Sequence, residues 1–283
     1  WVGTGENNSS RSSYSGIGIL KTDPSGSNWK NVGLIDSHHV GKIIINPDNK
    51  DHIVVGVTGH LYSKNENRGV YITKDGGDSW KKTLYVNDVT GIIDMASTPN
   101  TFNTIYASTW EKDRKAWNLD EAGKSSAIYK SIDGGETWNK ISIENSGFPV
   151  GEGVGRIGIA VYDENIVYAV LDNQYRRELN TQNENESITK ESFKDISVDD
   201  FKKIKSEDLN RFLRSNRFPR KYNAESVSSD INAGKIEPND LYSYLVNANS
   251  ELFDTPVIGA EVYKSFDGGQ SWKKTHETYL EGL

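Results

Sequence analysis

Alternating apolar and polar positions run in short stretches through residues 1–171 and predict β-strands. In three places such a stretch continues into Asp-Gly-Gly and leaves through Ser or Thr followed by Trp, at 69–82, 127–140 and 261–274. Glycine reaches positive φ without steric cost and Asp can bond its own backbone, so Asp-Gly-Gly turns the chain tightly. The pattern therefore predicts the same β-hairpin at three places in the chain.

The hairpin consensus, Ser/Thr-x-Asp-Gly-Gly-x-Ser/Thr-Trp, resembles the Asp-box, also called the bacterial neuraminidase repeat. We expect its Asp residues to lock the hairpins instead of touching sugar or metal, and each Trp to fold over its turn. A weaker copy at 21–29 keeps the Lys-to-Trp spacing and replaces Asp-Gly-Gly with a Pro-Ser-Gly turn. The predicted structural residues are Asp75, Gly76, Gly77, Trp80, Asp133, Gly134, Gly135, Trp138, Asp267, Gly268, Gly269 and Trp272.

A second repeated pattern supplies two more strands before each hairpin, so each unit has four strands, A to D, with the Asp-Gly-Gly turn between C and D. Four antiparallel strands every ~40–50 residues is the period of a β-propeller blade. We expect a mainly β fold with about four blades that form part of a larger propeller, and a closed four-blade ring is the alternative. The first blade begins at its B strand, and the blades span 1–32, 40–86, 91–143 and 154–276.

The fourth blade is interrupted, which predicts propeller blades over 1–171, a helical insertion in its B-C loop over 172–259, and its last two strands over 260–283. Residues 173–187 are polar, and we expect them to be flexible. Capping signals and apolar residues at helical spacing follow, and they predict a small helical subdomain that packs on itself or on the propeller. The predicted helices lie near 197–204, 208–216, 224–233 and 238–252.

The face opposite the Asp-Gly-Gly turns should carry any binding surface, because the long B-C and D-A connections lie there. Loops longer than ~12 residues in a compact domain are usually functional or disordered. The guanidinium group of arginine can bind a carboxylate through two parallel hydrogen bonds. Aromatic rings can stack on a sugar or a peptide, or they can simply cover the edges of blades. The predicted ligand-binding residues are Arg11, Arg68, Trp110, Arg114, Trp117 and Arg156, with Tyr14 and Tyr62 as further aromatic candidates.

Catalysis would need a pair of carboxylates flanking a glycosidic bond. The weak candidates on the same face are Glu6, Glu111, Glu152 and Asp172. No sialidase arginine motif, Gly-rich phosphate loop, serine elbow or zinc helix is recognisable. The neighbours His38 and His39 point to opposite sides of a strand, so we predict no metal site and no cofactor.

Composition narrows the class of partner. The chain has 33 Lys and Arg against 40 Asp and Glu, a net charge of −7, and no basic run, which argues against nucleic acid. No window approaches the ~18 apolar residues of a membrane span. There are no cysteines, which excludes a disulfide framework. No signal peptide opens the given chain, and Trp1–Thr4 reads as the middle of a strand, so we expect a longer protein.

The segments Trp1–Asn8, Gly69–Tyr71 with its turn, Val154–Ile157 and Thr255–Tyr263 together resemble a bacterial propeller family. Its members are similar to the sortilin (vacuolar sorting receptor) propeller, are often labelled glycosyl hydrolase, and resemble large secreted or cell-envelope proteins of Bacteroidetes. The resemblance covers roughly 1–171 and 256–283, and the lack of cysteine departs from sortilin.

The sortilin likeness implies binding of peptide or protein without catalysis, whereas the hydrolase label implies cleavage of glycosidic bonds. We therefore expect a non-catalytic binding or assembly module of an exported bacterial protein, secreted or in the cell envelope and part of a larger envelope complex. Its ligand would be protein, peptide or polysaccharide. The alternative is a sialidase- or endoglucanase-like glycoside hydrolase.

Overall fold

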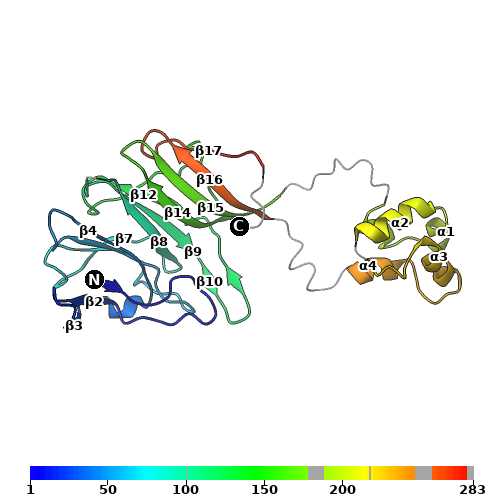
Figure 1. The fold of residues 1–283 in the computed structure, drawn as a ribbon, viewed down its shortest axis with the longest axis horizontal. Coiled ribbons are helices and arrows are strands. Elements are labelled where there is room, and N and C mark those ends of the chain that lie inside the picture. The colour runs from blue at the N-terminus through cyan, green and yellow to red at the C-terminus, as the bar shows by residue number, and fades with distance from the viewer. Residues whose placement is uncertain (100, 178–187, 217, 246–256, 279–283) are drawn as a thin grey trace. The chain divides into compact units, whose positions relative to one another are not determined.

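The computed structural model describes residues 1–283 apart from 100, 178–187, 217, 246–256 and 279–283 (Figure 1). The chain forms two compact units. The first is made of Trp1–Tyr175 and Val257–Leu283, and the second is Arg176–Pro256. Strands build the first unit and helices build the second.

Antiparallel sheets follow one another along the first unit in chain order. The first sheet contains β1 (Val2–Gly3), β2 (Ile19–Thr22) and β3 (Trp29–Asn31). After the short 3-10 helix η1 (Ile35–Ser37), the second contains β4 (Val40–Ile45), β5 (Ile53–Val57), β6 (Gly69–Thr73) and β7 (Lys81–Leu84). The third contains β8 (Thr90–Ser97), β9 (Ile105–Glu111), β12 (Ala127–Ser131) and β13 (Asn139–Lys140). The fourth contains β14 (Val154–Val161), β15 (Val167–Arg176), β16 (Val257–Ser265) and β17 (Lys273–Lys274).

The first strands of successive sheets lie next to one another. Strand β4 lies beside β1 and β8, and β14 lies beside β8. Asp94 on β8 connects three of the sheets: its carboxylate pairs with Lys42 Nζ on β4 at 3.2 Å and accepts the Ile159 N–H of β14 at 3.0 Å. Four-stranded antiparallel sheets arranged in this way give a mainly β, propeller-like fold, and this class was correctly predicted.

The middle strands of the second and third sheets are buried on both faces, because each of these sheets lies between two neighbouring sheets. All five residues of β5 are buried, as are the first six of β9. Apolar side chains such as Ile19, Val55 and Tyr71 fill the space between the first two sheets. Val54, Ile92 and Ile105 join the second and third sheets, and Ile128, Ile157 and Leu171 join the third and fourth. Burial of these side chains holds the stack of sheets together.

The three Asp-Gly-Gly turns share one hydrogen-bond pattern. Asp133 Oδ1 accepts the Ser131 hydroxyl at 2.7 Å and the Thr137 N–H at 3.0 Å, and Oδ2 accepts the Thr137 hydroxyl at 2.5 Å. The same bonds surround Asp75 and Asp267. Burial raises the pKa of Asp133, but the bonds from Thr137 and Ser131 outweigh it and bring it to about 2. Both glycines of each turn have φ between +68° and +97°.

The tryptophan that follows each turn is bonded to backbone carbonyl groups. The indole N–H groups of Trp138 and Trp272 donate to the second glycine of their own turns, at 3.0 and 3.1 Å. Trp80 instead donates to Val32 O of the preceding sheet, at 2.7 Å. In the weaker copy, Trp29 donates to Gly26 O at 3.1 Å, so the Pro-Ser-Gly turn makes an equivalent bond.

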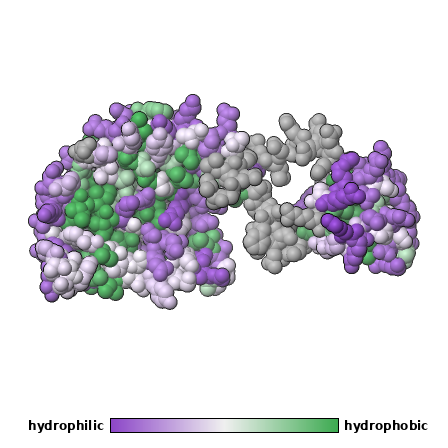
Figure 2. Space-filling model, in the orientation of Figure 1, coloured by the Kyte–Doolittle hydropathy of each residue, from purple (hydrophilic) through white to green (hydrophobic). Residues whose placement is uncertain are grey.

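The second unit has its own apolar core. Its elements are η2 (Lys190–Phe193), α1 (Val198–Phe201), α2 (Ser206–Ser215), α3 (Ala224–Asn232) and α4 (Asn239–Leu245). Ser197 caps α1 by accepting the Asp200 N–H, and Asn223 caps α3 by accepting the Ser226 N–H. Phe193, Phe201, Leu209, Phe212, Val227, Ile231 and Leu241 are buried together. Figure 2 shows that the visible surface of this unit is mostly hydrophilic.

Strands β15 and β16 extend beyond the predicted limits of the insertion at 172 and 259, because polar residues at their ends are paired across the sheet. The amide of Asn173 donates to Glu261 Oε2 at 2.7 Å, and the same oxygen accepts the Tyr263 hydroxyl at 2.7 Å. The predicted flexible stretch therefore begins in a strand, and 178–187 lies outside the described residues. The predicted helix end at Leu252 also lies outside them. None of the helices described here is long and apolar enough to cross a membrane.

Candidate functional site

One rim of the first unit gathers the longer connections between strands. We call this rim the loop face and define it by residues 4–18, 32–39, 58–68, 85–89, 112–126 and 141–153. Because consecutive strands run antiparallel, the three Asp-Gly-Gly turns lie on the opposite rim. The loop face includes a small hairpin formed by β10 (Asp113–Arg114) and β11 (Leu119–Asp120).

Large side chains on the loop face are exposed to solvent. Trp117, at the turn of the β10–β11 hairpin, is 83% exposed, and Tyr14 is 77% exposed. Ile17, Ile35 and Tyr62 are also exposed. The Tyr62 hydroxyl donates to Arg11 O at 2.6 Å and so connects the loops of the first two sheets. Single exposed apolar residues are ordinary, whereas a contiguous patch of them is typical of an interaction surface.

Beneath these loops lie two buried cationic side chains, Arg68 (2% exposed) and Lys112 (3% exposed). The Arg68 guanidinium donates to four backbone carbonyl groups, those of Asp88, Thr58, His60 and Ser63. Lys112 Nζ has one long hydrogen bond, to His60 O at 3.4 Å. Burial, followed by the charge of Arg68, lowers the pKa of Lys112 to about 7.

Three histidines lie beside these cations. The rings of His38 and His60 are stacked with centroids 3.7 Å apart, and His60 Nε2 is 2.9 Å from Asp36 O. Burial, followed by the charge of Lys112, lowers the pKa of His39 to about 4, so this ring is neutral at pH 7. Among the described residues no group of three His, Cys, Asp or Glu side chains could hold a metal ion.

Glu121 and Asp172 lie near one another where the loop face meets the fourth sheet. A Cβ built on Gly155 of β14 would meet the backbone carbonyl groups of both residues, so their backbones lie beside one glycine. Burial raises the pKa of Glu121, and the negative charge of Asp172 raises it further. Arg114 opposes the shift. This is an arrangement in which a carboxyl group can keep its proton nearer to neutral pH.

The four carboxylates predicted as weak catalytic candidates lie in separate settings. Glu6 is exposed. Glu111 accepts the Ser125 N–H at 2.9 Å and supports the loop that follows β11. Glu152 pairs with Lys124 at 2.8 Å on the surface, and Asp172 accepts the Gln174 amide at 2.8 Å. No two of these four share a hydrogen-bond partner in the part of the chain that is described.

The predicted ligand-binding residues divide into exposed and buried groups. Arg11, Trp117 and Arg156 are exposed, and the Arg156 guanidinium lies over the Trp110 ring, 5.7 Å from its centroid. Trp110 is buried and donates to Glu121 O at 2.8 Å. We therefore reassign Trp110 and Arg68 from ligand contact to support of the loop face, since their polar atoms already bond backbone carbonyl groups. The half-buried Arg114 has an Nε atom without a partner.

Lys112 was missed as a candidate in the sequence, and neither Glu121 nor His39 was singled out there. Lys112 had a detectable signal, because it follows the buried Trp110 by two positions and so continues the inward-facing side of an apolar strand. Glu121 had none, because its neighbour Asp172 lies far along the chain. His39 was judged only against its neighbour His38, without the loops that cover it.

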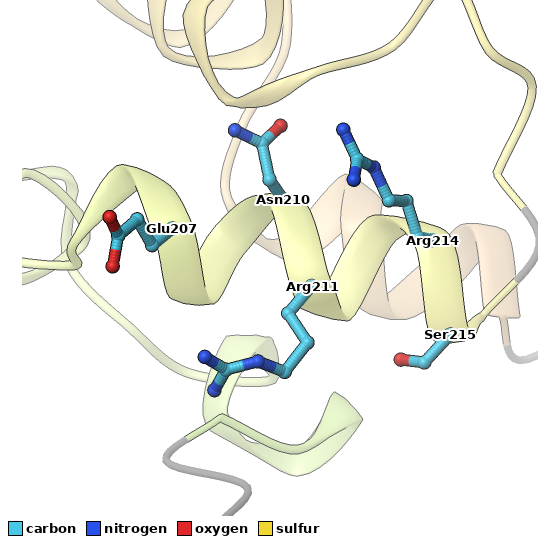
Figure 3. Close-up of a pocket in the computed structure, with 5 residues that line it drawn as sticks. All are labelled: Glu207, Asn210, Arg211, Arg214 and Ser215. Atoms are coloured by element: carbon cyan, nitrogen blue, oxygen red, sulfur yellow. The ribbon is translucent and has the colours of Figure 1, made fainter.

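The second unit has two hollows beside α2, of about 630 and 450 Å³. Glu207, Asn210, Arg211, Arg214 and Ser215 line the larger one. Figure 3 shows Asn210 and Arg214 pointing to one side of α2, and Arg211 and Ser215 to the other. Because the side chains that line the larger hollow do not converge, it lacks the arrangement of a polar binding site.

No protein-family model matches this chain, and no curated protein matches it. Solved structures with similar folds include a GH74 xyloglucanase from Xanthomonas campestris, at 16% identity and a TM-score of 0.44, covering 91% of this chain and 27% of that one. They also include YCF48 from Cyanidioschyzon merolae, at 17% identity and a TM-score of 0.30, covering 57% and 47%. The GH93 α-L-arabinofuranosidase of Fusarium graminearum shows 18% identity and a TM-score of 0.28, covering 47% and 39%. The chain spans only about a quarter of the xyloglucanase, and no site residue is transferred from these proteins.

Proposed function

We propose that the first unit is a non-catalytic binding or assembly module that engages protein, peptide or polysaccharide through the loop face. The observation that carries the proposal is the group of exposed large side chains there, above all Trp117 and Tyr14. Flat aromatic rings with one polar edge pack well on peptides and on sugar rings. The surrounding arginines, Arg11 and Arg156, can add hydrogen bonds to carboxylate or hydroxyl groups.

The opposite rim also has exposed large side chains, among them Trp29, Ile132, Tyr162 and Phe266, and the positions of two of them follow from the Asp-Gly-Gly turn. Ile132 and Phe266 each directly precede the Asp of an Asp-Gly-Gly turn, and Lys74 takes that place in the first turn. Their exposure therefore repeats with the hairpin and needs no ligand to explain it. This makes Phe266, 63% exposed, a suitable control for Trp117.

The rival function is a glycoside hydrolase. The carboxylate pair that suits it best in the structure is Glu121 and Asp172, and Glu121 is not one of the four predicted candidates. Glu121 would act as the general acid, since burial and the charge of Asp172 raise its pKa, and Asp172 would act as the base or nucleophile. Against this reading, Glu121 is half-buried and the Gln174 amide already engages Asp172. We therefore place binding ahead of hydrolysis.

A panel experiment separates the two functions. The purified chain is incubated with immobilised peptides and with neutral and acidic polysaccharides, and both retention and release of reducing ends are measured. The proposal predicts saturable retention with no turnover. Turnover that is abolished by Glu121→Gln or Asp172→Asn would establish the hydrolase instead. If the panel shows no retention and no turnover, both proposed functions are refuted.

We also propose that the sheets are Asp-box blades of a larger propeller in an exported bacterial protein, with the second unit inserted between β15 and β16. In β15, Val167, Ala169 and Leu171 are buried but Val170 on the other side is 48% exposed, whereas every residue of β5 is buried. Within the described part of the first unit, the fourth sheet thus has a neighbouring sheet on one face only, and a further blade would cover the other. Val170→Asp should leave the stability of this chain within about 0.5 kcal/mol and destabilise a chain that carries the next blade. Equal effects in both chains would contradict the larger ring.

A further inference from the structure

Arg68 and Lys112 bring two positive charges under the loop face without a directly bonded carboxylate. Neither residue takes part in an ion pair among the described residues. The two cations share one acceptor, the carbonyl oxygen of His60, to which Arg68 donates at 2.8 Å and Lys112 at 3.4 Å. A buried cation is costly unless it is paired or neutralised, so this region lacks negative charge.

The nearby carboxylates do not supply that charge by contact. Asp113 favours the charged form of Lys112, but its carboxylate is already paired with Lys115 at 2.7 Å. The charge of Asp88 favours the charged form of Arg68. However, Arg68 Nε donates its hydrogen bond to the backbone oxygen of Asp88 and not to the carboxylate. Arg114 adds a further positive charge next to Lys112.

Several buried polar atoms around the same cations have no hydrogen-bond partner. They are His39 Nδ1, Asn65 Nδ2, Thr90 Oγ1 and Arg114 Nε. The Asn65 N–H bonds the same Asp88 oxygen as Arg68, and the charge of Lys112 acts on the His39 ring. Each such atom costs free energy unless something bonds to it.

We propose that His39, Asn65 and Lys112 form a buried site for one small monovalent anion, such as a halide or an acetate-sized carboxylate. A single anion would accept from the Lys112 ammonium and from the unpartnered donors, and it would offset the combined charge of Lys112 and Arg68. Because Lys112 is almost fully buried, the site suits a free small ion better than a group on a large ligand. The site is separate from the proposed contact surface of Trp117 and Tyr14.

Bromide tests the proposal directly. Crystals soaked in sodium bromide should show an anomalous scattering peak within hydrogen-bond distance of Lys112 Nζ, and a matching acetate soak should show planar density there. The same soak of Lys112→Met should lose this peak and keep surface bromide sites. Water alone beside Lys112 Nζ, while other bromide sites are occupied, would overturn the proposal.

Unfolding in solution provides a second readout. At constant ionic strength, bromide should raise the Tm of the wild-type first unit, because a ligand of the folded state stabilises it by mass action. Lys140→Met removes an exposed lysine of β13 and should keep the full bromide response, whereas Lys112→Met should lose it. Equal responses in all three proteins would count against the site. If Lys112→Met does not fold, the wild-type bromide soak decides the question.

Discussion

Replacing Asp133 with alanine tests how the Asp-Gly-Gly turns stabilise the sheets. The carboxylate accepts bonds from Ser131, Glu136 and Thr137, and Asp133→Ala removes all of them while leaving the glycines in place. The backbone N–H groups lose a charged acceptor much as they do when a helix N-cap is truncated.

The size of the effect follows from the pKa of Asp133. It falls from an ordinary 3.8 to about 2, and linkage sets an upper limit of roughly 2.4 kcal/mol on the stabilisation by the charged form. Asp133 is exposed, so solvent screening reduces this, and we expect a loss of about 1 kcal/mol at pH 7.

The loss should depend on pH in a defined direction. A carboxyl group whose pKa is depressed in the folded state contributes fully above its unfolded pKa and loses the contribution as pH falls through the folded value. The difference between wild type and Asp133→Ala should therefore be constant above about pH 5 and shrink between about pH 4 and pH 2.

Urea unfolding followed by tryptophan fluorescence measures this difference cleanly. All 7 tryptophans belong to the first unit, so the helical unit does not contribute to the signal. Asp120→Ala, at an exposed carboxylate of β11, is the control and should change stability by less than about 0.5 kcal/mol. An unchanged midpoint for Asp133→Ala, or a loss that persists undiminished at pH 2, would refute the reasoning.

Three further outcomes follow from the same structure. Gly134→Val should destabilise the first unit by about 1–3 kcal/mol in urea melts, because φ is +73° and the new Cβ would meet the His52 ring at 3.1 Å; an unchanged melt would mean that the turn has another conformation. Glu261→Gln should cost about 1–3 kcal/mol, because it loses the Lys274 ion pair and disturbs the bonds from Asn173 and Tyr263; a neutral result would show that these bonds are replaceable. Replacing 177–256 with a short turn should leave the fluorescence melt of the first unit within about 0.5 kcal/mol, because the helical unit has a core of its own; loss of folding would show that the units are interdependent.

Local patterns predicted much of the fold. Strand alternation and Asp-Gly-Gly turns depend on neighbouring residues, so β4 to β9 and the hairpins could be located from the sequence. The ends of β15 and β16 could not, because polar Asn173 is buried only through its bond to Glu261, far along the chain. The apolar spacing that predicts the helices of the second unit also depends only on nearby residues. Helices α2 and α3 accordingly begin within two residues of the predicted starts.

The candidate site was less accessible to sequence reasoning. Whether an arginine or tryptophan on a loop reaches solvent depends on how the loops fold over the strand ends, and that is a tertiary property. Arg68 and Trp110 were therefore predicted as contacts but are buried, whereas the exposure of Trp117 matches its place at a hairpin tip. Glu121 lies in the loop after β11 and Asp172 lies in β15, and no spacing rule connects them.

The measurement that tests the central claim most directly compares two aromatic truncations. For any peptide or polysaccharide retained by the wild-type chain, Kd is determined for Trp117→Ala on the loop face and for Phe266→Ala on the opposite rim, with urea melts to confirm equal folding. Loss of an exposed aromatic contact should weaken binding by about tenfold or more for Trp117→Ala, and Phe266→Ala should match wild type. Unchanged affinity for Trp117→Ala together with weakened binding by Phe266→Ala would place the ligand on the Asp-Gly-Gly rim and contradict the account.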